Sequence, residues 1–239
     1  VLVRTVAAGV CHSDLHFQNG SYPYPLPVIL GHESAGVVEA VGSDVNYVKK
    51  GDHVITCLSA FCGHCEYCLT GQMSLCQEPE LQRKGDESPR LAQEGTPIAQ
   101  FLNLSSFAEY MLVHEHAVAK IREDMPLDRA ALIGCGVTTG VGAVIHTAAV
   151  EPGSTVAVVG CGGVGLSCIN GAEIAGASRI IAVDTIGSKL ELARKFGATD
   201  VVNAADNDPV EAVRELTGGG VHYAFEAIGL KLTTEQAFK

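Results

Sequence analysis

The chain contains 239 residues, of which 47% are hydrophobic, and it carries a net charge of −11 at pH 7. This length accommodates one large domain or two smaller ones, each with an ample core. The acidic balance argues against nucleic-acid binding, because no basic excess is present to neutralise phosphates. No apolar run approaches the length of a membrane span, and no signal-peptide pattern opens the chain. We therefore expect a cytoplasmic protein that binds neither nucleic acid nor membrane.

Residues 9–33 combine thiol, hydroxyl, imidazole and carboxylate groups within a short span. Three prolines near the end of this span exclude a helix interior, so we predict loop and short strand throughout it. Functional side chains concentrate in such segments. Cys11 and His32 are therefore candidate ligands of a catalytic zinc. The alternative is a buried cysteine and a hydrogen-bonded histidine.

The rest of the first half alternates strand-like runs with turns. Residues 34–41 are rich in β-branched side chains and end at a Gly-Ser-Asp turn, and residues 48–55 form a turn followed by another strand. Because no helical period is present, this part of the chain predicts a barrel-like β domain. Helices are expected further on, one capped by Asp128 and one over residues 138–150.

Four cysteines in the spacing C-x2-C-x2-C-x7-C follow the first strands. They are Cys62, Cys65, Cys68 and Cys76. Four thiolates this close can surround one tetrahedral ion with no open position, which is the arrangement of a structural zinc. An iron–sulfur cluster also takes four cysteines, but Gln77 stands where a ferredoxin run has proline. Cysteines clustered in a chain without an export signal favour a metal over disulfides. Zinc is therefore predicted, with an iron–sulfur cluster or free thiols as alternatives.

From residue 154 strands and helices alternate regularly. Residues 155–159 form a continuous apolar run, which is typical of a strand buried on both faces of a parallel sheet. The further strands are expected over residues 179–184, 200–203 and 221–228, and the helices over 166–175, 188–196 and 209–216. This alternation predicts βαβ units and therefore an α/β fold.

The turn after the first buried strand is rich in glycine. It consists of Gly160, Cys161, Gly162, Gly163, Val164 and Gly165. In a dinucleotide-binding turn the first glycine permits a tight bend, the second lets the backbone approach a pyrophosphate, and the third lets helix and strand pack closely. The N-terminus of the following helix offers N–H groups and a positive dipole end to the anion.

Asp184 ends the second strand, 19 residues after the last glycine of the turn. A carboxylate at this place accepts hydrogen bonds from the adenosine ribose and repels a 2′-phosphate, so NAD is favoured over NADP. Lys189 could equally contact the ribose or lie in solvent.

Together with the Gly-His-Glu run at His32 and the Gly-Cys-Gly run at Cys135, these motifs resemble those of the zinc-containing alcohol dehydrogenases, in the medium-chain dehydrogenase/reductase superfamily. The resemblance extends over essentially the whole chain, in order. It implies an α/β protein with a GroES-like, β-rich catalytic domain over residues 1–137. A Rossmann-type, doubly wound parallel-sheet domain, incomplete here, would occupy residues 138–239.

The same resemblance implies roles for individual residues near the first ligands. Cys11, His32 and Cys135 would bind a catalytic zinc with one open position, which makes two zinc ions per chain. Glu33 would lie behind this metal and tune it. Ser13 would contact the substrate oxygen, His16 would stand at the outer end of a proton relay, and His12 would lie against the coenzyme pyrophosphate. Three further positions would lie along the nicotinamide: Thr139, Val164 and Ile228. Four positions would line the substrate pocket, with core packing as their alternative role: Tyr22, Leu58, Phe101 and Leu102.

The implied activity is hydride transfer between NAD and a small primary or secondary alcohol, or the matching aldehyde or ketone. Glutathione-dependent formaldehyde dehydrogenases share the whole motif set and stay an alternative, whereas polyol dehydrogenases tend to carry glutamate where Cys135 stands. A non-catalytic NAD-binding protein or a redox-sensing zinc protein is the alternative of a different class. The three ligands with Ser13 and His16 favour the enzyme.

The resemblance also implies a six-stranded sheet in the dinucleotide domain, whereas the sequence supplies about four strands. We therefore expect an internal portion of a longer chain, inactive by itself, whose full-length parent is a homo-oligomer.

Overall fold

The computed structural model describes residues 1–78, 81 and 88–239. The chain forms two compact units, Val1–Cys135 and Gly136–Lys239. Within the described ranges no single helix is long and apolar enough to span a membrane, although one bent pair, Leu127–Gly134 with Gly136–Thr147, has the necessary length and composition.

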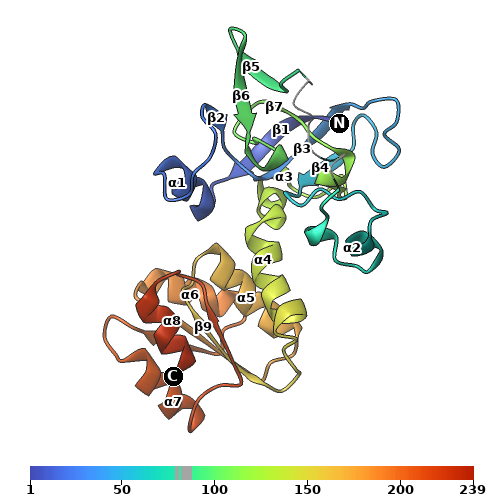
Figure 1. Ribbon diagram of the computed structural model, residues 1–239. Coiled ribbons are helices and arrows are strands. Elements are labelled where there is room, and N and C mark those ends of the chain that lie inside the picture. The colour runs from blue at the N-terminus through green and yellow to red at the C-terminus, as the bar shows by residue number, and fades with distance from the viewer. Residues whose placement is uncertain (79–80, 82–87) are drawn as a thin grey trace. The chain divides into compact units, whose positions relative to one another are not determined.

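The first unit is built on a five-stranded antiparallel sheet in the order β7-β1-β3-β4-β8 (Figure 1). Its strands are β1 (Leu2–Gly9), β3 (Glu33–Ala40), β4 (His53–Thr56), β7 (Tyr110–Leu112) and β8 (Val118–Lys120). A second sheet contains β2 (Val28–Ile29), β5 (Leu91–Gln93) and β6 (Thr96–Gln100). The short helices are α1 (His12–Gln18), α2 (Glu66–Leu69), η1 (Met73–Leu75), η3 (Phe101–Asn103), η4 (Glu115–Ala117), α3 (Leu127–Ala130) and η5 (Ala131–Gly134).

The larger sheet of the first unit has buried clusters on both faces, and the larger cluster is built on three neighbouring strands. Val3, Val38 and Val54 come from three neighbouring strands and are almost completely buried. Burying a side chain of this kind contributes about 1.5–3 kcal/mol. Gly36 on β3 has a separate role, because a Cβ there would lie 2.3 Å from a backbone oxygen of β1. Only glycine lets the two strands approach this closely.

The second unit is built on a four-stranded parallel sheet in the order β11-β10-β9-β12. Its strands are β9 (Thr155–Val159), β10 (Arg179–Asp184), β11 (Asp200–Asn203) and β12 (Tyr223–Glu226). Its helices are α4 (Gly136–Gly142), η6 (Ala143–Thr147), α5 (Gly163–Ile174), α6 (Gly187–Lys195), α7 (Pro209–Thr217) and α8 (Lys231–Phe238). The strand order reverses between β9 and β12, and such a switch point is where open α/β sheets bind ligands.

Helices cover both faces of the parallel sheet. Successive side chains of β10 point to opposite faces, so Ile180 and Ala182 join the core under α5 and α6. Ile181 and Val183 join the core under α7 and α8. A strand buried on both sides needs apolar residues without alternation, which is the pattern seen in its sequence. The predicted fold class, a β-rich GroES-like part with a doubly wound parallel sheet, is confirmed.

Three local predictions are wrong. Residues 12–18 form α1 rather than a loop, because the prolines begin only at residue 23, beyond the end of the helix. Helix α3 is capped by Pro126, not by Asp128. Residues 138–150 are not one α-helix, because the last turns widen into the π-helical η6, whose Ala148 N–H donates to the Ala143 carbonyl.

Candidate functional site

Three separate segments of the first unit bring a thiol, an imidazole and a second thiol together. Cys11 caps the N-terminus of α1, His32 lies between β2 and β3, and Cys135 follows η5. Their ligand atoms all lie within 4.8 Å of one another, and the two Sγ atoms are 3.8 Å apart. Two thiolates at about 2.3 Å from one tetrahedral ion would be about 3.8 Å apart, so the donor set fits zinc.

The protonation of these groups favours metal binding. Hydrogen bonds from Cys135, His32 and Ser13 lower the pKa of the Cys11 thiol to about 3. The same proximity raises the pKa of Cys135, because a neighbouring thiolate and burial both oppose a second negative charge. The hydrogen bond to Cys11 raises the pKa of His32. The lowered pKa of Cys11 favours its thiolate, which is the form that binds zinc.

Asp14 is a part of this site that the sequence interpretation missed. Its side chain is 4% exposed, and Oδ1 lies 3.2 Å from His32 Nδ1. The same oxygen accepts from the Gly31 N–H at 3.1 Å, while Oδ2 accepts from the Cys11 N–H at 3.0 Å. A carboxylate behind a histidine ligand fixes the tautomer and the orientation of the ring. The Cys-x-x-Asp spacing resembles a capping box, and this was the signal available in the sequence.

The other predicted residues around this centre have distinct environments. Ser13 donates to the Cys11 sulfur through both its backbone and its hydroxyl. Glu33 is buried, and its charge raises the pKa of Cys135, so the carboxylate acts on the ligand set. His12 and His16 lie one turn apart on α1, with ring centroids 4.7 Å apart.

The four-cysteine loop forms a second cluster. Cys65 caps α2, Cys68 lies within it, and Cys76 follows η1. The Cys65–Cys68 Sγ distance is 3.5 Å, and the Cys62–Cys68 and Cys65–Cys76 distances are 3.8 Å. These separations are too long for disulfides and match the ~3.8 Å expected around a tetrahedral zinc.

Backbone N–H groups further prepare this cluster for a cation. Cys62 Sγ accepts from the N–H groups of His64 at 3.4 Å and Cys65 at 3.3 Å. The N–H of Glu78 lowers the pKa of Cys76 to about 7. No side chain in residues 57–78, all of which the structure describes, is fully buried. A loop without a core of its own depends on its metal for stability.

We expect Cys65→Ser to reduce the zinc content from two ions per chain to one. The loop should then open, and limited proteolysis within residues 57–78 should become at least about tenfold faster, because cleavage follows local opening. His64→Asn is the matched control, since His64 forms a possible alternative cluster with Cys62 and Glu78. Zinc loss in His64→Asn, with retention in Cys65→Ser, would show that this alternative cluster holds the metal.

The Gly-rich loop connects β9 to α5 at the switch point of the second unit. Gly160 has φ +96°, a conformation that residues with a side chain rarely adopt. A Cβ on Gly165 would lie 1.7 Å from the Gly160 carbonyl oxygen. Around Gly162, which caps α5, a Cβ would meet no protein atom within 4 Å. The loop is therefore closed behind Gly160 and Gly165 and open at Gly162, on the side where an anion would approach.

Asp184 lies beside this loop. Its Oδ2 accepts from the Cys161 N–H at 2.8 Å, and Oδ1 accepts from the Ile186 N–H at 3.0 Å. Each carboxylate oxygen has further acceptor capacity for ribose hydroxyls. Lys189 Nζ is 3.8 Å from Asp184 Oδ2, so its charge lies near the carboxylate, while its side chain is 44% exposed to solvent.

Three predicted nicotinamide positions belong to the second unit. Ile228 follows β12, and its side chain would touch a Cβ placed on Gly160 at 2.5 Å, so it lies at the switch point. Val164 is half-buried against the core under α5. Thr139 is exposed on α4.

The four pocket candidates differ among themselves. Phe101 is completely buried, with its ring 4.7 Å from that of Phe17 and 5.7 Å from that of His32. This environment is that of a packing residue behind the ligand. Tyr22 and Leu58 are 53% and 38% exposed, and Leu102 is half-buried at φ +48°.

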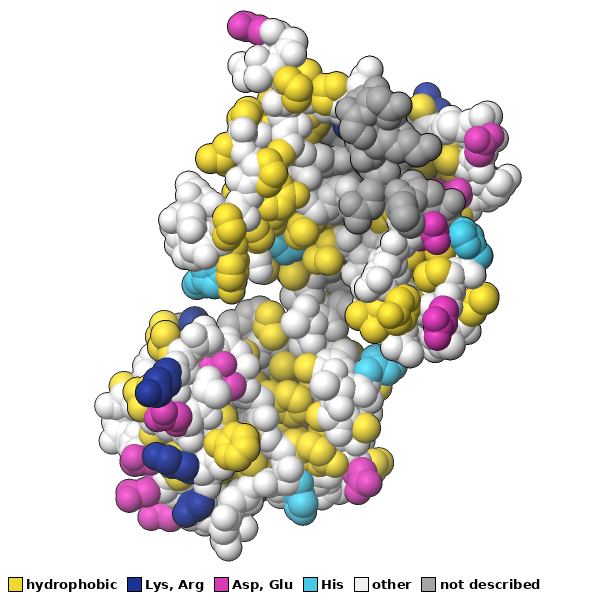
Figure 2. All heavy atoms as spheres, in the orientation of Figure 1, with side chains coloured by type: hydrophobic (Ala, Val, Ile, Leu, Met, Phe, Trp, Pro, Cys, Tyr) yellow, Lys and Arg dark blue, Asp and Glu magenta, His cyan; other side chains and the backbone are white. Residues whose placement is uncertain are grey.

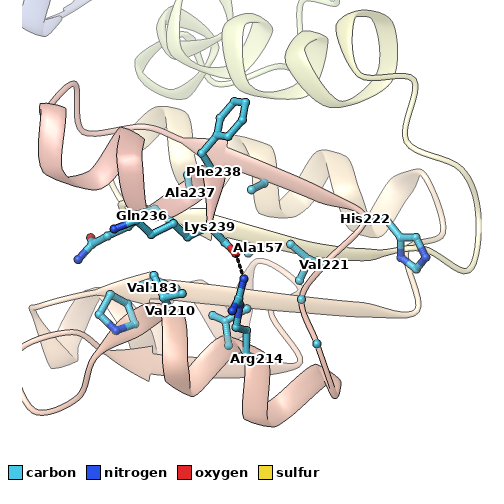
Figure 3. Close-up of a pocket in the computed structure, with 16 residues that line it drawn as sticks. Ala157, Val183, Val210, Arg214, Val221, His222, Gln236, Ala237, Phe238 and Lys239 are labelled. Atoms are coloured by element: carbon cyan, nitrogen blue, oxygen red, sulfur yellow. Dashed lines mark hydrogen bonds between the residues drawn. The ribbon is translucent and has the colours of Figure 1, made fainter.

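A cavity of about 420 Å³ lies elsewhere in the second unit (Figure 3). It is lined by residues of β9, β12, α7 and the end of α8, and Arg214 donates to the Lys239 carbonyl at its rim. The residues that line it include neither the Gly-rich loop nor a cysteine. This cavity is therefore not part of the predicted dinucleotide site.

Comparison with known proteins decides the family. A family model described as the alcohol dehydrogenase GroES-like domain matches residues 1–123, and one described as a zinc-binding dehydrogenase matches residues 163–239. The chain belongs to the zinc-containing alcohol dehydrogenase family. This assignment confirms the predicted resemblance.

Individual alcohol dehydrogenases are similar along most of the chain. The class-3 alcohol dehydrogenase of Oryza sativa subsp. japonica is 45% identical over 237 residues, which are 96% of this chain and 62% of the relative. An alcohol dehydrogenase zinc-binding domain protein from Burkholderia ambifaria is 45% identical, with a TM-score of 0.91 over 99% of this chain and 65% of its own. The chain thus spans less than two thirds of the length of these relatives.

Two further solved structures bear on substrate and coenzyme. The benzyl alcohol dehydrogenase of Acinetobacter calcoaceticus is 41% identical, with a TM-score of 0.87 over 99% of this chain and 65% of its own. A zinc-binding dehydrogenase from Sinorhizobium meliloti 1021, solved with NADP, is 30% identical, with a TM-score of 0.80 over 99% and 65%. Zinc and a nicotinamide dinucleotide are therefore the cofactors of this family.

Proposed function

We propose that this protein is a zinc-dependent alcohol dehydrogenase that transfers a hydride between a primary or secondary alcohol and NAD. The observation that carries the proposal is the convergence of Cys11, His32 and Cys135, whose ligand atoms lie within 4.8 Å of one another. Three donors leave a tetrahedral ion one open position, which a catalytic zinc needs and a structural zinc lacks. The open side of the Gly-rich loop supports the coenzyme assignment.

The chain's own residues supply the proton path in this proposal. Zinc, when bound, would supply a Lewis acid for the substrate oxygen. The Ser13 Oγ would accept the alcohol proton while its own hydroxyl proton passes on toward His16, and for this step the hydroxyl would turn away from the Cys11 sulfur to which it donates here. His16 follows three positions later on α1, on the same helix face, and carries the proton toward solvent. Asp14 keeps the His32 ring fixed while this happens.

The preference for NAD follows from Asp184. Its two backbone hydrogen bonds hold the carboxylate at the end of β10, where a 2′-phosphate would meet a negative charge. A like charge held close disfavours binding, and Lys189 at 3.8 Å offsets this only in part. A relative was solved with NADP, and the NAD/NADP ratio of kcat/KM therefore tests this preference.

The test is NADH formation by the zinc-loaded protein with a series of primary, secondary and benzylic alcohols, by fluorescence. We expect turnover with NAD in the longer parent protein, whereas residues 1–239 alone are expected to be inactive. In the parent, Asp184→Ala should shift the NAD/NADP ratio of kcat/KM toward NADP by about tenfold or more, which corresponds to ~1.4 kcal/mol. Glu191→Ala, which removes an exposed carboxylate from α6, is the matched control and should leave the ratio unchanged.

Other outcomes distinguish the alternatives. Turnover of formaldehyde only when glutathione is present would favour a glutathione-dependent formaldehyde dehydrogenase. Turnover restricted to polyols would favour a polyol dehydrogenase and would contradict the use of Cys135 as evidence against that group. Binding of zinc and NAD without turnover of any alcohol would favour a binding or redox-sensing protein.

A further inference from the structure

Helix α1 carries two histidines on one face. His12 and His16 are separated by four positions, and their ring centroids lie 4.7 Å apart at an interplanar angle of 72°. Side chains at i and i+4 of a helix meet on the same side, one turn apart. Two imidazoles in this arrangement can bind a single transition-metal ion, as the two histidines of helical zinc motifs do.

The helix is fixed before any ion arrives. At its N-terminus the Cys11 N–H donates to Asp14 Oδ2 at 3.0 Å, and the Asp14 N–H donates to the Cys11 carbonyl at 3.0 Å. At its other end the Tyr22 N–H donates to the His16 carbonyl at 3.2 Å. Because the backbone is held at both ends, binding orders little beyond the two imidazole rings. Such preorganisation favours chelation.

The pair is accessible and distinct from both cysteine clusters. His12 is exposed and His16 is half-buried. Figure 2 shows histidine side chains in cyan at several places on the surface. The Tyr22 ring covers one side of His16, with centroids 5.3 Å apart. Asp14, on the inner side of the helix, is engaged with His32 and Gly31. Water would complete the coordination of an ion held by the two outer rings.

The donor chemistry defines the ligand. Two neutral nitrogen donors suit Ni²⁺, Cu²⁺ and Zn²⁺, whereas Mg²⁺ and Ca²⁺ require oxygen donors. The chain's net charge of −11 adds a general attraction for cations.

We propose that His12 and His16 form a chelating site for a nitrogen-preferring divalent cation, which inhibits the enzyme when it is occupied. Inhibition follows because the same imidazoles would serve the coenzyme phosphates and the proton path, and an ion on them blocks both. This consequence rests on the proposed function, whereas binding of the ion does not. A trace metal would then act as a reversible inhibitor that competes with NAD.

The experiment is calorimetric titration of the zinc-loaded protein with Ni²⁺, without coenzyme or alcohol. We expect one site, with no comparable binding of Mg²⁺. His12→Asn and His16→Asn should each weaken Ni²⁺ binding by about tenfold or more. In a chelate the second imidazole is present at a high effective concentration, and each variant removes one of the two imidazoles. The double variant should bind Ni²⁺ no more than about twofold more weakly than either single variant. The single imidazole that remains in each single variant cannot chelate, so removing it as well has little further effect. Circular dichroism checks that each variant is folded.

Two exposed histidines elsewhere, His64 and His222, provide the matched controls His64→Asn and His222→Asn. Unchanged Ni²⁺ binding in these controls supports the pair, and loss of binding in either would place the ion elsewhere. Additive losses from His12→Asn and His16→Asn would overturn the proposal, because they indicate independent imidazoles. Once turnover is established, Ni²⁺ should raise the KM for NAD. Ni²⁺ binding without any turnover would support the histidine site and would contradict only the proposed function.

Discussion

Cys11→Ser is expected to lose one zinc ion per chain and to lower kcat/KM by about 1,000-fold or more, which corresponds to ~4 kcal/mol of activation free energy. A serine hydroxyl stays protonated near neutral pH, so it cannot replace the thiolate that the neighbours of Cys11 stabilise. His32 and Cys135 then form an incomplete donor set. Native mass spectrometry measures the zinc content, and steady-state kinetics measures the loss.

Cys57→Ser is the matched control for this variant. Cys57 is a half-buried thiol that belongs to neither cysteine cluster, and its Sγ makes one long contact, 3.9 Å, to the Ser59 carbonyl. Its replacement should leave two zinc ions and normal turnover. If Cys11→Ser also kept two zinc ions and normal turnover, the assignment of the catalytic donor set would be wrong.

Gly165→Ala is expected to lower the free energy of unfolding of the second unit by about 3 kcal/mol. The added Cβ would lie 1.7 Å from the Gly160 oxygen and 2.9 Å from the Gly160 carbonyl carbon. Both are backbone atoms of the tight turn, so no side-chain rotation relieves the overlap, and α5 must move away from β9. Denaturant titration monitored by circular dichroism gives the change.

Two glycines separate this packing effect from an effect on the coenzyme. Gly187→Ala, at the first position of α6, meets no atom within 4 Å and should leave stability equal or higher by about 0.5–1 kcal/mol. Gly162→Ala should leave stability unchanged and weaken NAD binding, because its Cβ would occupy the open side of the loop. Equal stability losses at positions 162 and 165 would show that the loop has no open side.

Most strands and helices of the second unit could be predicted from the sequence. Strands β9 and β10 are apolar on both faces, so each stands out as a continuous run between turns, and the glycine spacing places the loop between β9 and α5. The four-cysteine loop was equally predictable, because one short segment contains all of its ligands. Cys135 was different: it lies 124 positions from Cys11, and only the family resemblance joined the two.

The features that were not predicted from the sequence, such as helix α1 and the role of Asp14, depend on contacts between distant parts of the chain. Helix α1 has seven residues, too short for a hydrophobic period to appear, and its stability comes from the Cys11–Asp14 cap and from tertiary bonds. Asp14 itself acts through residues far along the chain. Whether Phe101 lines a pocket or packs behind His32 depends on burial, which its hydrophobic character alone does not specify.

The three hydrogen bonds of Asp14 have a consequence for metal exchange. They hold two of the three predicted zinc ligands, Cys11 and His32, in place together with Gly31 and without a metal. In the four-cysteine loop backbone N–H groups support the sulfurs, and none of residues 57–78 is buried. We therefore expect an ion held by Cys11, His32 and Cys135 to be exchangeable in the folded protein, for example for cobalt as a spectroscopic probe. Release of an ion from the four-cysteine loop should instead require local unfolding, so we expect the two sites to differ in metal lability.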